Sequence, residues 1–303
     1  MATVIVFDEY GGPDVLHPIE VPDPVPGPGQ VHIRIRAAGV QPFDCLFRTG
    51  AAHQWMLANF PQTLGNEFAG VIDAVGYDVM ALSAGDEVLG WAMLACYAEY
   101  VVVGAGQIVA KPADMPWEQA GVVSASGQTA STAMTELGVG GDTVLIHAAA
   151  GGVGSFAVQI AKARGATVIG TASQRNHEYL RSLGAIPVTY GDGLADRVRA
   201  ATPDGVHAAL DAAGTVEALH ASLELVGDKR RIVTTAFQPA AQELGVRRIS
   251  TDRSVARLAE LTDLYAEGKL RIATRTYPLA KAAEAHRTVE TGHVRGKVVL
   301  IVA

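Results

Sequence analysis

A run of small residues that follows an apolar, strand-like segment constrains this chain more than any other feature. Val144–His147 leads directly into Ala148–Gly154, and a helical pattern begins there. Ala149, Gly151 and Gly154 occupy the three positions of the G-x-G-x-x-G pattern, with alanine in place of the first glycine. The second glycine lets the backbone approach a pyrophosphate, and the third lets the helix pack closely on the strand. The run therefore predicts a strand–turn–helix unit that binds a dinucleotide at the helix N-terminus.

Strand-like and helix-like segments alternate after residue 117. A helix is expected at Gly154–Arg164, with Gly165 as its C-cap. Such alternation is typical of a doubly wound parallel sheet. This context disfavours the alternative interpretation of the glycine-rich run as a tight turn without a ligand. Strands are expected at Thr143–His147, Thr167–Thr171, Ile186–Thr189, His207–Leu210 and Arg230–Thr235.

Residues 1–110 consist of short strand-like segments separated by turns, which indicates a β-barrel-like first domain. A helix over Leu279–Glu290 and a strand over Lys297–Val302 have no βαβ partner of their own, so we expect this tail to return to the first domain. The predicted domains are therefore residues 1–118 with 269–303, and residues 119–268. In the first domain, strands are expected at Val4–Phe7, Val31–Arg36, Ala69–Val75, Glu87–Gly90 and Tyr97–Val103.

Composition excludes several classes of protein. The 303 residues are 49% hydrophobic and 18% charged, which excludes a disordered acidic chain, a coiled coil and a collagen-like chain. A net charge of −7 without a Lys/Arg cluster argues against a nucleic-acid partner. No apolar run approaches the roughly 18–20 residues that span a bilayer, and the N-terminus lacks a basic segment of the signal-peptide type. We expect a soluble, cytoplasmic protein with a small-molecule substrate and no membrane partner.

The segment that follows the second expected strand indicates which dinucleotide binds. An NAD site normally carries Asp or Glu about 20 residues after the glycines, where it accepts from the ribose 2′-OH. Here Thr171 lies 20 residues after Gly151, and the segment that follows contains Ser173 and Arg175 but no acid. A hydroxyl and a guanidinium suit a 2′-phosphate, which favours NADPH/NADP+. A solvated Arg175 at a helix start is the alternative.

Other catalytic patterns are missing from the sequence. The nine histidines form no H-x-x-x-H or H-E-x-x-H, and Cys45 and Cys96 form neither a CxxC nor a disulfide framework. Ser124-Ala125-Ser126-Gly127 is not the G-x-S-x-G of a serine hydrolase. No Gly-Lys-Ser/Thr follows the glycines, so a P-loop is excluded as well.

Several further segments together carry a family resemblance. They are Ala37–Asp44, Gly65–Gly70, Gly85–Val88, Tyr97–Tyr100, Ala148–Gly154, Thr171–Ser173, Leu183–Ala185 and Gly292–Leu300. With them, nearly the whole chain resembles the medium-chain dehydrogenase/reductase superfamily, specifically its zinc-free quinone oxidoreductase branch. The resemblance implies an α/β fold, with a GroES-like β-barrel catalytic domain beside a Rossmann doubly wound parallel sheet.

The resemblance also bears on metal and mechanism. Zinc-binding relatives place a Cys ligand where Gln41 stands and a His where Asn66 stands, and their four-cysteine lobe is missing here between Leu89 and Tyr97. We therefore predict no metal. Zinc-free relatives transfer hydride from the nicotinamide C4 to quinones or to the β-carbon of enones. They mostly have Asn at the Gln41 position, and many have Tyr at the Leu46 position.

The same resemblance assigns roles to individual residues. Gln41 and Asp44 would polarise or anchor the acceptor carbonyl and the ribose. Glu67 would act as an acid/base or, as is more frequent in a zinc-free site, pair structurally with an arginine. Leu46, Trp55, Met56 and Trp91 would form an apolar substrate pocket, with ordinary core packing as the alternative for Trp55, Met56 and Phe60. The 2′-phosphate of the cofactor would be bound by Ser173, Arg175 and Tyr190, and the pyrophosphate by Ala150, Gly151, Gly152 and Val153. Thr129 would lie near the nicotinamide, and the ribose and carboxamide would be covered by Ala213, Gly214, Ala236 and Phe237. Lys297 would reach the cofactor from the tail.

Three functions remain open from the sequence. The first is an NADPH-dependent, zinc-independent reductase of quinones or α,β-unsaturated carbonyl compounds. The second is a pathway-specific enoyl or ketone reductase of a bulky natural product, and the third is a non-catalytic NADPH-binding sensor or structural protein. We also predict a homodimer, because the strand around Gly245–Ile249 should lie at the sheet edge, with Leu244, Val246 and Ile249 offering an apolar face.

Overall fold

The computed structural model describes residues 1–236 and 239–303, so Phe237 lies outside the described residues. The chain divides into two compact units. The first comprises Met1–Ala125, Ser254–Thr262 and Ala273–Ala303, and the second comprises Ser126–Arg253 and Asp263–Ile272. This division places Ser254–Thr262, within helix α9 (Val255–Ala266), in the first unit, whereas the sequence analysis assigned that segment to the second domain.

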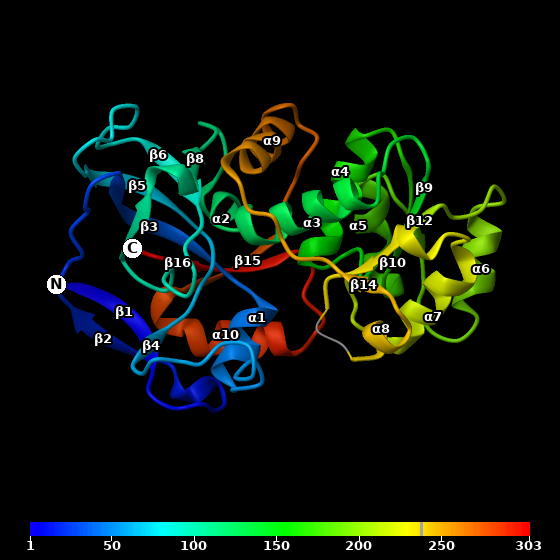
Figure 1. The fold of residues 1–303 in the computed structure, drawn as a ribbon, viewed down its shortest axis with the longest axis horizontal. Helices are drawn as coiled ribbons and strands as arrows, with labels where there is room; N and C mark the ends of the chain where they lie inside the picture. Colours follow the sequence, from blue (N-terminus) through cyan, green and yellow to red (C-terminus); the bar gives the residue numbers. More distant parts are fainter. Residues whose placement is uncertain (237–238) are drawn as a thin grey trace. The chain divides into compact units, whose positions relative to one another are not determined.

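The first unit is built on a mixed seven-stranded sheet and a smaller three-stranded one (Figure 1). The large sheet has the order β15-β16-β3-β5-β6-β8, and β7 also pairs with β3. The small sheet has the order β2-β1-β4. The strands are β1 Ala2–Phe7, β2 His17–Val21, β3 Gln30–Val40, β4 Gln62–Thr63, β5 Phe68–Val75, β6 Glu87–Gly90, β7 Tyr100–Gly104, β8 Ile108–Ala110, β15 Thr274–Pro278 and β16 Lys297–Ile301.

The C-terminal tail, Ala273–Ala303, belongs to the first unit. Strand β16, red in Figure 1, pairs antiparallel with β3, so that Val298 faces Val40 and Leu300 faces Ala38. Val298 and Leu300 are fully buried in the core of this unit. Helix α10 (Ala282–Glu290) precedes β16 and contacts α1 (Pro42–Arg48). The tail therefore brings α10 side chains next to those of α1.

The second unit contains a six-stranded parallel sheet of order β11-β10-β9-β12-β13-β14. The chain runs outward from β9 on one side and returns to β12 on its other side, which places the topological switch point between β9 and β12. The strands are β9 Thr143–His147, β10 Thr167–Thr171, β11 Ile186–Val188, β12 Ala208–Asp211, β13 Ile232–Thr234 and β14 Arg247–Arg248. The helices are α3 Ser124–Glu136, which begins in the first unit, then α4 Gly152–Ala163, α5 His177–Ser182, α6 Leu194–Ala201, α7 Val216–Leu225 and α8 Pro239–Glu243.

The sheet edge lies where the sequence predicted it, but its chemistry differs. Strand β14 is the edge strand and pairs only with β13 among the described strands. Its two residues, Arg247 and Arg248, are exposed, whereas Val246 and Ile249 are buried and Leu244 packs against the unit's own core. The predicted apolar face at this edge is therefore wrong, because its apolar side chains already close the core beneath the sheet.

Candidate active-site residues

The glycine-rich turn joins β9 to α4 with very little space. Gly151 is the N-cap of α4, and its amide donates to Ala148 O at 2.9 Å. A Cβ on Gly154 would clash with Ala148 O and would lie 2.7 Å from Ala149 Cα, so only glycine lets the helix lie against the turn. A Cβ on Gly170 of β10 would lie 2.9 Å from Ala149 Cβ, so the neighbouring strand leaves room for alanine at the first motif position.

Helix α4 is 12 residues long, and its first helical turn begins directly after the glycine-rich loop. The first amides of an α-helix have no intrahelical partner and carry the positive end of the helix dipole. Gly151, Gly152 and Val153 are partly accessible, and Ala150 is buried beside them. The turn has the donors and the small side chains that a pyrophosphate requires.

The residues predicted at the 2′-phosphate follow two paired strands. Strand β10 ends at Thr171 and lies parallel to β11, with Thr171 opposite Val188. Ser173 caps the short 3₁₀ turn Gln174–Asn176, and its carbonyl accepts from the Asn176 amide at 2.8 Å. Arg175 and Tyr190 are both exposed. The segment thus presents a hydroxyl and a guanidinium at the carboxyl edge of the sheet, with no carboxylate between residues 167 and 176.

Two further loops of the second unit contain predicted cofactor residues. Ala213 is exposed, and Gly214 has φ +69°. A Cβ on Gly214 would lie 2.8 Å from Ala236 Cβ, so the loops after β12 and β13 touch each other. Thr129, on α3, shares a hydrogen bond of 2.8 Å with Thr251 through their hydroxyls.

In the first unit, Gln41 is held by a buried carboxylate. Its Nε2 donates to Glu67 Oε1, and Glu67 Oε2 accepts from the Ala125 amide at 2.6 Å. Lys297 Nζ lies 3.0 Å from Glu67 Oε1, and both side chains are buried. The expectation that Glu67 pairs with an arginine was wrong: its partner is Lys297, supplied by β16. A Cβ on Gly39 would clash with the Glu67 carboxylate, so glycine on β3 makes room for it.

Asp44 lies at the centre of a second buried network. Its Oδ2 accepts from the Gln41 amide at 2.8 Å and from the Tyr97 hydroxyl at 3.1 Å. Its Oδ1 accepts from Asn66 Nδ2 at 2.7 Å and from the Gly65 amide at 3.3 Å. Burial raises the pKa of Asp44 to about 6, although these donors favour the ionised form. Both carboxylate oxygens therefore bind protein groups, which fits a positioning residue better than one that contacts substrate.

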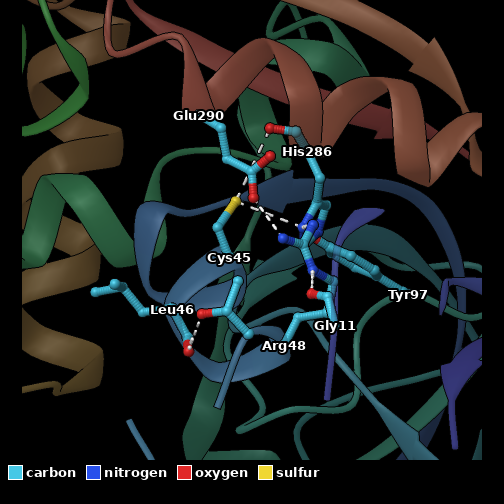
Figure 2. Close-up of polar contacts among 8 residues, drawn as sticks. Gly11, Cys45, Leu46, Arg48, Tyr97, His286 and Glu290 are labelled. Carbon is cyan, nitrogen blue, oxygen red and sulfur yellow. Dashed lines mark hydrogen bonds and ion pairs between the residues drawn. The ribbon is translucent and has the colours of Figure 1, made fainter. Parts of the chain in front are cut away.

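The network continues through His286 to the C-terminal helix (Figure 2). His286 Nδ1 lies 3.2 Å from Arg48 Nη1, and His286 Nε2 lies 3.1 Å from the Tyr97 hydroxyl. Arg48 also pairs with Glu290. A guanidinium can only donate, so His286 Nδ1 must accept and Nε2 must carry the proton. The donor order is therefore Arg48 to His286, His286 to Tyr97, and Tyr97 to Asp44.

The protonation states of this network follow from its burial. Burial, with a smaller contribution from the Arg48 charge, lowers the pKa of His286 to about 3, so the ring is neutral near pH 7. Cys45 Sγ lies 3.4 Å from His286 Nδ1, and burial raises the pKa of this thiol far above its usual range. A buried, protonated thiol is a poor nucleophile. Cys45 is therefore a packing residue of the network.

The residues predicted for an apolar substrate pocket are accessible rather than packed. Trp55 is 55% exposed, so core packing is excluded for it, and Leu46 and Met56 are also exposed. Trp91 is partly buried. Phe60 packs edge-on against Phe7 and Tyr10 but stays 40% exposed. Figure 2 shows the Leu46 side chain directed away from the polar cluster around His286.

The donor set does not suit a zinc ion. Among the described residues, no group of three or more His, Cys, Asp or Glu side chains could hold a metal. Gln41 and Asn66 offer amides, whereas zinc in proteins is bound by thiolates, imidazoles and carboxylates.

No helix in residues 1–236 and 239–303 has the length and apolarity that crossing a bilayer requires.

Comparison with known proteins identifies the family. Residues 27–113 match the family described as alcohol dehydrogenase GroES-like domain, and residues 183–300 match the one described as zinc-binding dehydrogenase. A quinone oxidoreductase of Pseudomonas aeruginosa is 32% identical over 99% of this chain and 100% of its own length. The chain therefore belongs to the medium-chain dehydrogenase/reductase superfamily, in its quinone oxidoreductase branch, and the predicted GroES-like and Rossmann fold is confirmed.

Two further relatives show which kinds of protein this chain is similar to. The solved Escherichia coli quinone oxidoreductase complexed with NADPH has a TM-score of 0.87 and 26% identity, with 99% of each chain covered. The spectinabilin polyketide synthase system protein NorB of Streptomyces orinoci is 35% identical over 90% of this chain, which spans 13% of NorB. The family thus contains both free-standing quinone oxidoreductases and a segment of a polyketide synthase protein.

Sequence reasoning missed the residues that hold the candidate site in place. Tyr97 was noted only as part of an expected strand and of a family segment, and no role was assigned to His286, Arg48 or Asp211. Tyr97 and His286 are 189 positions apart in the chain, and no local spacing signals their contact. Asp211 directly follows the strand predicted at His207–Leu210, and this position could have indicated its role, because a buried carboxylate needs hydrogen-bond donors and loop amides supply them.

Proposed function

We propose that this protein is an oxidoreductase that uses NADPH to reduce a quinone or an α,β-unsaturated carbonyl compound without zinc. The observation that carries the proposal is the β9–α4 turn, where Gly151 precedes the helix and Gly154 lets the helix lie against the turn, together with Ser173 and Arg175, which follow β10 in place of an acid. The E. coli relative, which was solved in complex with NADPH, supports the choice of cofactor.

The residues of the second unit suit NADPH in three places. The amides of the first turn of α4 would bind the pyrophosphate. Ser173, Arg175 and Tyr190 would surround the 2′-phosphate, because a guanidinium and hydroxyls complement a dianion. The loops that contain Ala213, Gly214 and Ala236 would bind the ribose and carboxamide, and Thr129 would lie near the nicotinamide. When bound, the cofactor supplies the hydride, and the protein orients it and excludes water.

On the acceptor side, we assign Gln41 the role of a hydrogen-bond donor to the carbonyl oxygen of the substrate. Glu67 accepts from its Nε2 and fixes the plane of the amide, and Asp44 fixes its backbone amide. Lys297 then acts through Glu67, although direct contact with the cofactor stays a prediction. With Leu46 in place of a tyrosine, we infer that water delivers the proton that completes reduction.

The accessible apolar residues Leu46, Trp55, Met56 and Trp91 favour a flat or bulky acceptor. A quinone fits this description, and so does the enoyl group of a large natural product. The similarity to NorB favours the second candidate, a pathway-specific enoyl reductase. A non-catalytic NADPH-binding protein is the remaining alternative, which would bind the cofactor without turnover.

The deciding experiment measures NADPH oxidation, as the loss of NADPH absorbance, with a panel of quinones, simple enones and bulky enoyl thioesters. Turnover with quinones supports the first candidate, and turnover with enoyl thioesters alone supports the second. Arg175→Ala should raise the dissociation constant of NADPH about tenfold or more by removing a charge-assisted bond, and should leave that of NADH nearly unchanged. Arg199→Ala, at an exposed arginine of the same unit paired with Glu224, is the matched control. Equal losses for both cofactors in Arg175→Ala would refute the NADPH assignment.

A cytoplasmic location and a homodimer are also part of the proposal. With the apolar face at the β14 edge corrected, the remaining support for a dimer is the position of β14 at the edge of the sheet, where the sheets of two copies could join. Light scattering at micromolar concentration tests it, and a mass near the 31.6 kDa of one chain would refute it.

A further inference from the structure

One buried carboxylate at the end of β12 ties together two loops of the second unit. Asp211 is fully buried, and its Oδ1 accepts from the amides of Ala213 and Gly214, each at 2.9 Å. Its Oδ2 accepts from the hydroxyl of Thr234, at the end of β13, at 2.8 Å. Thr234 Oγ1 in turn accepts from the Ala236 amide at 3.1 Å. The loops after two adjacent strands are thus anchored to the same side chain.

The two loops also touch each other, so their positions depend on each other. A Cβ added to Gly214 would lie 2.8 Å from the Cβ of Ala236. The Thr235 amide donates to the Asp211 carbonyl at 2.9 Å, which adds a backbone link between the same two strand ends. A shift of either loop would therefore break a bond to Asp211 or press on the other loop.

Asp211 lies at the point of the sheet where a ligand is expected. It ends β12 opposite His147, the last residue of β9, and these two strands flank the topological switch point. His147 bonds to Ser222 Oγ at 3.0 Å through Nε2, and burial lowers its pKa to about 4. His147 is therefore neutral near pH 7.

We propose that Asp211 is a positioning residue for the nicotinamide half of the cofactor, and that it acts by fixing the backbone of residues 213–214 and 235–236. The inference rests on the proposed NADPH function and names a residue to which that function assigned no role. Oδ1 accepts from two amides, Oδ2 accepts the hydrogen of the Thr234 hydroxyl, and the oxygen of that hydroxyl is the acceptor for the Ala236 amide.

The test separates the two halves of the cofactor. Asp211→Ala and Thr234→Val are compared with wild type for binding of NADPH and of 2′,5′-ADP, which contains the 2′-phosphate but no nicotinamide. Thr202→Val is the matched control, because Thr202 is also a buried threonine of the second unit, and its hydroxyl bonds to the carbonyl of Gly205 in its own loop. We expect Asp211→Ala to raise the NADPH dissociation constant about tenfold or more and Thr234→Val severalfold, with 2′,5′-ADP binding within about twofold of wild type.

A second readout needs no cofactor. Amide hydrogen exchange in the unliganded protein should accelerate at Ala236 alone in Thr234→Val, and at Ala213, Gly214 and Ala236 in Asp211→Ala. Thr234→Val keeps the test decisive if Asp211→Ala does not fold. Unchanged NADPH binding in a folded variant, or equal losses for NADPH and 2′,5′-ADP, would overturn the inference. Wild-type protein that binds neither compound would instead refute the proposed function, and the exchange measurement would still show whether Asp211 anchors both loops.

Discussion

Replacement of Tyr97 by phenylalanine tests the buried network that surrounds Asp44. The substitution keeps the ring and removes one oxygen, which donates to Asp44 Oδ2 and accepts from His286 Nε2, each at 3.1 Å. Because Nδ1 of His286 accepts a hydrogen bond from Arg48, the proton of the ring stays on Nε2. Tyr97→Phe therefore leaves a buried donor without an acceptor and takes one of four donors from a buried carboxylate.

The expected loss of stability follows from these two broken bonds. An orphaned buried donor costs about 1–3 kcal/mol, and a hydrogen bond to a charged group contributes about 1.5–3 kcal/mol. We expect the free energy of unfolding to fall by about 3 kcal/mol. Tyr277→Phe is the matched control, because this hydroxyl bonds to Thr288 Oγ1, at 2.6 Å, in a partly buried site of the same unit. Its loss should be about 1 kcal/mol.

Urea unfolding followed by tryptophan fluorescence measures this loss. The three tryptophans, Trp55, Trp91 and Trp117, all lie in the first unit, so the signal reports the unit that contains Tyr97. The difference between the two variants should also depend on pH. The Tyr97 bond favours ionised Asp44, whose folded pKa is about 6, so its contribution is present above pH 6 and is lost as the pH falls through 6. Equal losses in Tyr97→Phe and Tyr277→Phe, or a difference that does not change with pH, would refute the reasoning.

Three further predictions concern other parts of the molecule. Gly154→Ala should cost about 1–3 kcal/mol and weaken NADPH binding, because its Cβ clashes with the backbone of the turn; Gly140→Ala, which meets nothing within 4 Å, is the control, and thermal unfolding by circular dichroism compares them. Stability should fall as the pH drops from 6.5 to 4, because His147 and His286, with folded pKa values of about 4 and about 3, take up protons only on unfolding. Asp44, with its pKa raised to about 6, offsets one of these protons, so urea titrations should show a slope of about 1.4 kcal/mol per pH unit, and a flat profile would contradict it. Elemental analysis should find substoichiometric zinc in active, chelator-treated protein, and zinc lost together with activity would overturn this prediction.

The sequence by itself determined the architecture of both units. The strands at Thr143–His147, Thr167–Thr171 and Glu87–Gly90 have the predicted bounds, because apolar runs bounded by glycine and polar residues are local signals. The spacing of Ala149, Gly151 and Gly154 located the strand–helix turn for the same reason. A helix or strand is encoded by neighbours along the chain, and so is a turn that only glycine can make.

Only the tertiary structure decided how the candidate site is held. Tyr97 reaches Asp44 across 53 positions and His286 across 189, and Lys297 takes the place expected for an arginine beside Glu67. Such partners are chosen by which side chains the packed sheets and helices bring together. A buried polar group must find a donor or acceptor wherever the fold supplies one, and a linear pattern cannot specify that choice. Asp44 is an example: the family resemblance implied contact with the acceptor carbonyl or the ribose, whereas donors from the protein bind both of its carboxylate oxygens.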